Sequence, residues 1–253
     1  MKSGGLTGGI YKPLSSAQVE LIHNEALRLL QEVGMAYESG QDEMLELVKH
    51  AGCRVDPAAM RIFFPPQLVE EMVAQAPGEI NLYSRDGKND LHLGKDRVYA
   101  GTGGTTVKVL DIDSGEVRQS VLKDIHNVAR IVEEMTHIHF FQNCCAPTDV
   151  PLEDYDVNIT FAAMMGTRKH IMFGCTCEQG LRDTHRMATR IAGGKDALDV
   201  RQLFSISACI IISPLKFCTQ STANVRTAAE LNVLTTVTSA PMSGSTAPMT
   251  MAG

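Results

Sequence analysis

The sequence predicts an α/β fold, in which an N-terminal layer of helices and β-meander precedes the parallel βα units of an incomplete (β/α)8 barrel. Two observations carry this prediction. Before residue 121 the pattern gives helices and then short strands with turns, whereas after residue 122 strand and helix alternate about four times. We therefore expect a flexible arm over 1–13, the N-terminal layer over 14–121, and the first half of a barrel, truncated at its C-terminus, over 122–253.

The N-terminal layer is expected to begin with three helices. A helix from Leu14 to Gly34 has Ser15 or Ser16 as its cap, and its apolar positions recur at helical spacing. The apolar positions of this amphipathic helix are Val19, Ile22, Ala26, Leu29, Leu30 and Val33. Two shorter helices follow, at Gln41–His50 and Gln67–Gln75.

Short alternating strands complete this layer. Turn pairs such as Asp86-Gly87 and the hairpin turn Asp113-Ser114-Gly115 separate pieces too short for helices. The expected meander segments are Asn81–Gly94, Val98–Ala100, Thr105–Asp111 and Glu116–Val121.

The second part is expected to alternate strands with helices. The predicted strands are His137–Cys145, His170–Thr176, Gln202–Ile212 and Val233–Ser239. The predicted helices are Lys123–Glu134, Asp154–Gly166, Gln179–Ala192 and Leu215–Glu230. The first three strands are mostly apolar, which is typical of parallel strands covered on both faces.

A doubly wound open sheet and a closed barrel share this pattern, and two observations favour the barrel. No Gly-x-Gly-x-x-Gly follows any predicted strand, so the usual dinucleotide loop is missing. The sequence also stops at Thr250–Gly253 in what resembles a loop opening a helix, and its barrel-like part is about half of the roughly 250 residues that eight βα units need. We therefore expect an incomplete chain.

Composition excludes several function classes. A formal charge of -6 and the lack of a basic stripe argue against nucleic acid. No apolar run of about 18 residues and no signal-peptide core appear, so we expect a cytoplasmic protein with no membrane partner. The seven cysteines are an odd, scattered set that we expect to be reduced thiols.

Function in parallel α/β folds lies at the carboxyl ends of strands, which selects the candidate substrate-binding residues. Asp149 follows the first strand and Glu178 the second; either carboxylate could hold a cationic ammonium, act as an acid or base, or simply cap a helix. Met242, Ser243 and Gly244 follow the fourth strand, where the loop could bind an anion, line an apolar pocket or only turn the chain.

Other residues at these positions are less informative. Gly101–Thr105 is a further candidate loop, although it precedes a strand and not a helix. Cys175 and Cys177, with Cys144-Cys145 one strand earlier, could hold a metal, but packing is the better interpretation because no His follows at ligand spacing. His137 and His139 lie at a strand start, so we predict no metal site.

Short motifs over nearly the whole chain resemble one known family. The motifs include Ala51-Gly52-Cys53-Arg54-Val55, Ser84-Arg85-Asp86, Gly101-Thr102-Gly103, Leu122-Lys123-Asp124-Ile125, Ser213-Pro214-Leu215 and Met242-Ser243-Gly244-Ser245-Thr246-Ala247-Pro248. In these motifs and in their order along the chain, the sequence resembles the N-terminal half of the trimethylamine methyltransferase family, which includes relatives without pyrrolysine that act on glycine betaine.

The resemblance implies a (β/α)8 barrel that transfers a methyl group from a methylated amine, such as trimethylamine or glycine betaine, to the Co(I) corrinoid of a small partner protein. It implies no cofactor bound directly by this chain, and it places the pyrrolysine position in the C-terminal half. The catalytic residues therefore remain unknown. A half barrel exposes sheet edges, so we expect this chain alone to be inactive and prone to aggregate, and a homo-oligomer is possible.

Two alternatives stay open at this point. A lyase or aldolase could use Glu178 and Asp149 for acid-base work, although Lys169, the candidate Schiff-base lysine, lies at a strand start. A non-catalytic barrel is the other alternative, because fold does not fix function. Binding of a corrinoid protein separates the methyltransferase from both.

Overall fold

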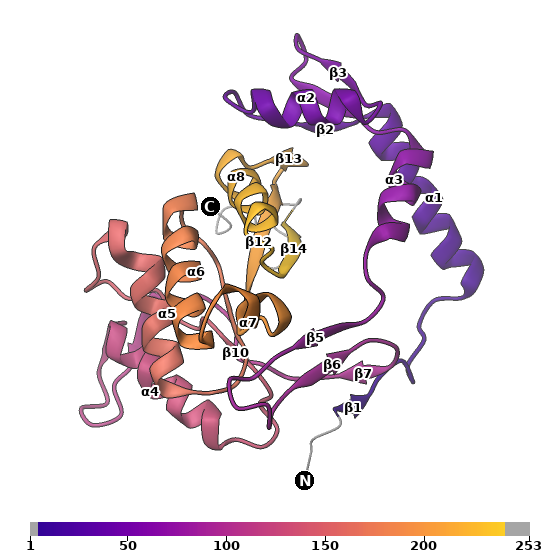
Figure 1. Ribbon diagram of the computed structural model, residues 1–253. Helices are drawn as coiled ribbons and strands as arrows, with labels where there is room; N and C mark the ends of the chain where they lie inside the picture. Colours follow the sequence, from indigo (N-terminus) through magenta and orange to yellow (C-terminus); the bar gives the residue numbers. More distant parts are fainter. Residues whose placement is uncertain (1–4, 241–253) are drawn as a thin grey trace. The chain divides into compact units, whose positions relative to one another are not determined.

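The computed structural model describes residues 5–240, and the chain forms two compact units (Figure 1). The sheet unit comprises Met1–Gly8, Glu79–Ala208 and Ala223–Thr236. The helical unit comprises Gly9–Gly78, Cys209–Thr222 and Val237–Gly253. The predicted substrate-binding residues Met242, Ser243 and Gly244 lie outside the described residues. None of the helices within residues 5–240 is both long enough and apolar enough to span a membrane.

The helical unit contains the three predicted N-terminal helices, α1 (Ser16–Glu32), α2 (Asp42–His50) and α3 (Pro66–Gln75). A capping box starts α1, because the Ser15 hydroxyl accepts from the Gln18 N–H at 3.3 Å and the Gln18 amide oxygen accepts from the Ser15 N–H at 2.8 Å. Three short strands pair antiparallel in the order β2 (Met35–Ala36), β4 (Arg61–Phe63) and β3 (Arg54–Asp56).

The apolar stripe of α1 contributes no residue to the buried cluster of the helical unit. Val19, Ile22 and Leu29 are exposed in the structure, as are Ala26 and Val33, and Leu27 is the one buried residue of the helix. The periodicity locates an apolar stripe but cannot say whether the same chain covers it. The buried cluster of this unit is correspondingly small, consisting of Tyr37, Cys53 and Ile62.

The helical unit is completed by a segment from far along the chain. The end of β12 (Phe204–Ile212) pairs antiparallel with β13 (Lys216–Phe217), and β13 pairs with β2. The sequence predicted one helix over Leu215–Glu230, whereas the structure places β13 there and starts α8 (Thr219–Glu230) later. Non-local pairing with β2 overrides the local helical pattern, as tertiary contacts often do.

The sheet unit contains the predicted βα alternation. The strand β10 (Phe141–Gln142) pairs parallel with β11 (Ile171–Phe173), which pairs parallel with the start of β12; β14 (Thr235–Ala240) also pairs with β12. The intervening helices are α4 (Leu122–Glu134), α5 (Tyr155–Gly166) after the 3-10 turn η1 (Leu152–Asp154), α6 (Glu178–Ala192) and α7 (Lys195–Val200). The predicted strands extend beyond β10 and β11 at both ends, because the continuous pairing between these two strands is confined to their central residues.

An additional segment continues the parallel arrangement on the other side of β10. Gly101 pairs with Phe140 and Thr106 with Cys145, both in parallel. Between these points the Thr102 hydroxyl donates to the Gln142 carbonyl at 2.6 Å and accepts from the Gln142 N–H at 2.8 Å, in place of a backbone ladder. The candidate loop Gly101–Thr105 therefore lies beside β10 as an interrupted strand.

The neighbours in this sheet follow chain order: segment 101–106, β10, β11, β12 and β14. A doubly wound sheet reverses its strand order at a switch point, whereas a barrel adds each strand beside the last. These five segments contain no reversal, although the same sheet continues from β12 through β13 to β2, β4 and β3. The described residues form no closed ring, so the structure shows a mixed α/β fold and does not by itself show a barrel.

Two hairpins form the predicted meander: β5 (Ile80–Leu82) with β6 (Leu91–Leu93), and β8 (Lys108–Leu110) with β9 (Val117–Gln119). A long-range antiparallel pair joins β1 (Leu6–Thr7) to β7 (Arg97–Val98). The last pairing joins part of the predicted arm to the sheet unit. The core of this unit lies between the parallel strands and their helices, with Phe141, Phe173 and Phe204 as its largest members.

Candidate functional site at the carboxyl ends of the parallel strands

The loops after β10 and β11 hold the polar residues that the chain places at the carboxyl ends of its parallel strands. The loop after β11 runs from Gly174 to Cys177 and leads directly into α6. Helix α5 supplies a buried carboxylate to this loop, and α8 supplies a buried amide. These side chains form the candidate site.

Asp156, near the start of α5, is the central residue of the site and is buried. One oxygen, Oδ2, accepts the Thr176 N–H and hydroxyl, both at 2.9 Å, and the Cys177 N–H at 3.3 Å. The Cys175 thiol also donates to Oδ2, at 3.3 Å. Because these donors are all neutral, Asp156 is held by hydrogen bonds and not by one of the ion pairs seen among the described residues.

Gly180 and Cys175 pack closely against the Asp156 carboxylate. Gly180, in the first turn of α6, faces the carboxylate so closely that an added Cβ would overlap Oδ2 of Asp156. Burial raises the pKa of the Cys175 thiol, and the neighbouring Asp156 charge raises it further. Cys175 is therefore a protonated donor at neutral pH and not a thiolate nucleophile.

Asn224 of α8 adds a buried amide whose oxygen can still accept a hydrogen bond. Its Nδ2 donates to the Cys175 carbonyl at 2.8 Å. Its Oδ1 is buried and accepts no hydrogen bond from any described residue. An orphaned buried acceptor costs free energy unless water or a ligand satisfies it, so this oxygen marks a position where a donor would be stabilised.

The predicted site residue Glu178 is the first residue of α6. Its Oε2 accepts the Thr227 hydroxyl at 2.6 Å and forms an ion pair with Arg226 at 3.0 Å. The Thr227 hydrogen bond and then the Arg226 charge lower the pKa of this carboxyl, against the effect of burial. Glu178 is therefore ionised at neutral pH, with part of its charge already balanced.

The other predicted carboxylate, Asp149, caps a helix. Its Oδ1 accepts the Leu122 N–H, the first residue of α4, at 2.8 Å, and the side chain is otherwise exposed. This is the helix-capping alternative that the sequence left open. No hydrogen bond joins Asp149 to Glu178 within the described part of the chain.

Sequence reasoning missed Asp156 and Asn224. Both lie inside helices, where polar residues are normally assigned to solvent. The one available signal was Gly180, since a glycine in the first turn of a helix indicates that another group approaches closely.

The cysteines do not assemble a metal centre. All seven are free thiols. No group of three or more His, Cys, Asp or Glu side chains converges anywhere in residues 5–240. Cys175 and Cys177 serve the loop instead, since the Cys177 sulfur caps α6 by accepting the Gly180 N–H at 3.3 Å.

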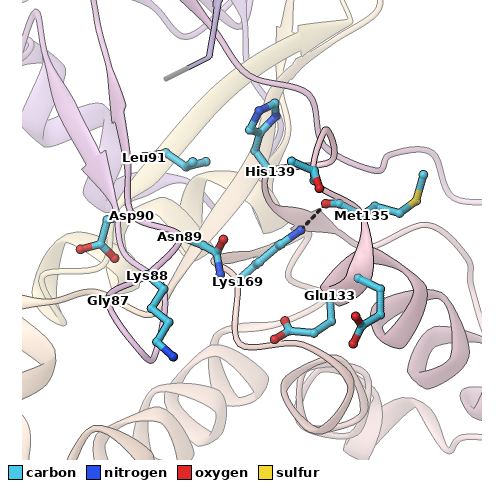
Figure 2. Close-up of a pocket in the computed structure, with 11 residues that line it drawn as sticks. Gly87, Lys88, Asn89, Asp90, Leu91, Glu133, Met135, His139 and Lys169 are labelled. Carbon is cyan, nitrogen blue, oxygen red and sulfur yellow. Dashed lines mark hydrogen bonds between the residues drawn. The ribbon is translucent and has the colours of Figure 1, made fainter. Parts of the chain in front are cut away.

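A cavity of the sheet unit lies at the opposite, amino-terminal ends of β10 and β11 (Figure 2). It has a volume of about 440 Å³ and a mostly polar lining that includes Lys88, Glu134, His139 and Lys169. Lys169 is buried, and its Nζ donates to the carbonyls of Val132, Met135 and Ile138 at 2.6–2.7 Å, which caps the C-terminus of α4. The amine of Lys169, the candidate Schiff-base lysine, is thus engaged by backbone carbonyls at the end of α4.

The comparisons with known proteins identify relatives over nearly the full chain. Residues 6–253 match the family model described as trimethylamine methyltransferase (MTTB). Trimethylamine methyltransferase MttB of Desulfitobacterium hafniense DCB-2 is 30% identical over 94% of this chain and 48% of that protein. Glycine betaine methyltransferase of D. hafniense Y51 is 25% identical, covering 96% and 50%. MttB of Methanosarcina thermophila is 24% identical, covering 94% and 50%.

This chain therefore spans about half the length of the curated relatives that it matches. The family match covers nearly every residue that the structure describes, including the strands, the β11–α6 loop and the helices of both units. The resemblance read from short motifs is confirmed, and the chain belongs to the trimethylamine methyltransferase family.

Proposed function

We propose that this chain is part of a methyltransferase that moves a methyl group from a methylated amine, trimethylamine or a quaternary amine such as glycine betaine, to the corrinoid of a separate partner protein. The observation that carries the proposal is the family match over residues 6–253, and the two relatives named for trimethylamine and glycine betaine support the substrate class. The bound corrinoid of the partner would supply a Co(I) nucleophile that takes the methyl group.

Methyl transfer from a methylated amine requires a site that binds a cation and excludes water. A methyl group leaves nitrogen readily only when the nitrogen is positively charged, since the departing amine then carries away the electron pair of the broken C–N bond as a neutral molecule. A cationic ammonium is stabilised by nearby carboxylates and by a low-dielectric wall. Asp156 and Glu178 are both carboxylates at the carboxyl end of β11, and Cys175 is a neutral neighbour.

In this proposal the carboxylates have different roles. Asp156 is buried among neutral donors, so its negative potential is not cancelled by a contacting cation among the described residues. Glu178 is half-buried and shares its charge with Arg226, so it would meet the substrate at the edge of the site. Asp149 and the loop residues Met242, Ser243 and Gly244 complete the proposed substrate-binding set.

We also propose that the parallel sheet is part of a (β/α)8 barrel. The support is the unreversed order of segment 101–106, β10, β11, β12 and β14, together with a length about half that of the relatives. A half barrel lacks the strands that would face the candidate site from the other side. We expect the catalytic residues to lie there.

The test mixes a reduced corrinoid protein with this chain and, in parallel, with a longer protein of the relatives' length that contains it. Trimethylamine and glycine betaine are added one at a time, and methylation of the corrinoid is followed by its absorbance. We expect amine-dependent methylation with the longer protein and none with the chain alone. A corrinoid that methyl iodide methylates but that neither amine methylates with the longer protein would contradict the proposal.

A matched pair of variants locates the cation. In the longer protein, Glu178→Gln should raise KM for the amine by about tenfold, since losing a charge-assisted contact costs about 1.4 kcal/mol. Glu153→Gln, an exposed carboxylate of η1, is the control and should leave KM unchanged. Equal KM values for both variants would remove Glu178 from the site.

A further inference from the structure

The loop between β11 and α6 leaves the sheet before it reaches the candidate site. Strand β11 ends at Phe173, where its pairing with β12 also ends. Over residues 174–177 the backbone is held by side chains that come from two other helices, α5 and α8. The conformation of this loop therefore depends on residues that lie outside it.

Asp156 of α5 holds the N–H groups of the loop. Its Oδ2 accepts the N–H of Thr176 at 2.9 Å and that of Cys177 at 3.3 Å, and its Oδ1 accepts the Thr176 N–H at 3.1 Å. The Thr176 hydroxyl and the Cys175 thiol are two further donors to Oδ2. All of these donors belong to the consecutive residues 175–177, so one carboxylate restrains the whole loop.

Asn224 of α8 holds a carbonyl of the same loop. The part of α8 from Ala223 onward belongs to the sheet unit, together with α5 and α6. The Asn224 Nδ2 donates to the Cys175 carbonyl at 2.8 Å. Thr227, one turn later on the same face of the helix, donates to Glu178 at 2.6 Å. Helix α8 therefore contacts both the loop and the first residue of α6.

The burial of Asp156 is unfavourable by itself. The residue is 2% exposed, and its side chain accepts from neutral donors within the described part of the chain. Removing a carboxylate from water costs several kcal/mol, which neutral hydrogen bonds offset only in part. Water could satisfy the N–H groups of an exposed loop at a lower cost. Local choices that reduce stability are expected where function requires a particular geometry.

We propose that Asp156 and Asn224 are positioning residues, which together fix the β11–α6 loop and thereby place Glu178 against the cationic nitrogen of the substrate. This inference rests on the proposed function, in which Glu178 meets the amine. Glu178 directly follows the loop, and the first turn of α6 lies against Asp156, where Gly180 leaves no room for a side chain. A shift of the loop therefore moves the Glu178 carboxylate, and a displacement of 1 Å can cost about 100-fold in rate.

The first experiment measures amide hydrogen exchange in the longer protein that contains this chain. Asp156→Asn keeps the size of the side chain but replaces one acceptor by a donor. Exchange at Thr176 and Cys177 should become at least about tenfold faster, since an opposed hydrogen bond costs about 1.4 kcal/mol. The β11 amides of Ile171–Phe173 should exchange as before. Asp154→Asn, the same change at an exposed residue of η1 with no capping hydrogen bond, is the control.

These exchange rates decide whether Asp156 restrains the loop. Unchanged rates at Thr176 and Cys177 would overturn the proposal. Equal acceleration in β11, or an equal effect of Asp154→Asn, would also overturn it, because Asp156 would then support the sheet or the start of α5 in general.

A second variant tests positioning without changing any charge. Asn224→Leu has a similar size but cannot donate to the Cys175 carbonyl. We expect KM for the amine to rise at least about fivefold, the equivalent of one hydrogen bond, while kcat changes less than about twofold. A purely structural role would lower kcat with the fraction of folded enzyme and leave KM unchanged, which would overturn the proposal. Asn127→Leu, at an exposed residue of α4, is the control and should change neither constant.

A double variant shows whether the effect passes through Glu178. In the Glu178→Gln background, Asn224→Leu should raise KM less than about twofold, because the group that the loop places is already lost. A fully additive effect would mean that Asn224 acts on the amine by itself, and would overturn the proposal. The exchange measurement needs no amine, so the two claims can fail separately. A protein that uses neither amine overturns the proposed function and the role of Glu178, whereas unchanged exchange overturns the positioning alone.

Discussion

The sheet unit and the helical unit differ in how much of their apolar surface they bury. The sheet unit buries its apolar residues in one large cluster, with strands and helices contributing from residue 125 to residue 233. The helical unit buries three residues in its cluster and leaves most of the apolar stripe of α1 exposed. The comparison indicates that the sheet unit is stabilised mainly by its own core, whereas the small buried cluster of the helical unit contributes less.

The largest expected effect tests the core of the sheet unit. Phe173 is buried and its ring lies 5.8 Å from that of Phe204. Phe173→Ala should lower the free energy of unfolding by about 3–5 kcal/mol, because it removes buried surface and leaves a cavity. Phe161→Ala, a half-exposed ring of α5, is the control and should cost much less in the same denaturant titration. Equal losses would mean that the sheet unit is not held by this core.

The stability of the sheet unit should also depend on pH through one buried group, His170. Burial lowers the pKa of His170 to about 4, and the ring is held by the Tyr83 carbonyl and the Ser205 hydroxyl. The unfolded chain binds a proton near pH 6.5 whereas the folded chain does not, so the stability contribution is complete above about pH 6.5. It should fall by about 3 kcal/mol as the pH drops to 4.

The measurement is the unfolding free energy of the sheet unit between pH 7 and pH 4, compared with His170→Gln. The variant should have a flatter profile, because it lacks the group that titrates. A profile identical to that of the parent chain would show that His170 does not control this acid sensitivity.

A smaller effect is expected at the candidate site. Gly180→Ala puts a methyl group against the Asp156 carboxylate and should destabilise the sheet unit by about 1–3 kcal/mol, even though alanine is the better helix former. Gly78→Ala, where an added Cβ meets no atom within 4 Å, is the control. Thermal unfolding of the two variants checks this prediction. An unchanged or higher Tm for Gly180→Ala would mean that the Asp156 side chain can move to accommodate the methyl group at little cost.

The smallest expected effect concerns the helical unit. Ser15→Ala removes half of the capping box and should destabilise α1 by about 1 kcal/mol. Amide hydrogen exchange in the first turns of α1 measures this locally. Ser16→Ala is the control, since the structure makes Ser15 the cap; faster exchange for Ser16→Ala than for Ser15→Ala would reassign the start of the helix.

Local patterns in the sequence predicted much of the fold. The helices α1–α6 lie within a few residues of their predicted bounds, because caps, glycine stops and apolar periodicity are encoded within one or two turns. The strands β10 and β11 lie within the predicted strands, which were too long. The interrupted strand 101–106 was predicted as a loop over most of its length. In that strand a Thr102 side chain replaces backbone pairing, which no propensity reveals.

The candidate site was less predictable, for a physical reason. Asp149 and Glu178 were predicted as site residues because they follow strands, and this rule depends on chain order alone. The structure places Glu178 beside the β11–α6 loop and Asp149 against the start of α4. Asp156 and Asn224 were missed because they reach the β11–α6 loop from helices α5 and α8. Their roles depend on which helix packs against which loop.

The sequence by itself determined the family, the succession of helices and strands, and the apolar stripe of α1, since each is a property of consecutive residues. Tertiary structure alone decided that β13 pairs with β2 in place of extending a helix, that Lys169 caps α4, and that Asp156 is buried among neutral donors. These features arise from contacts between residues far apart in the chain, whose free energies depend on burial and geometry that local composition does not encode.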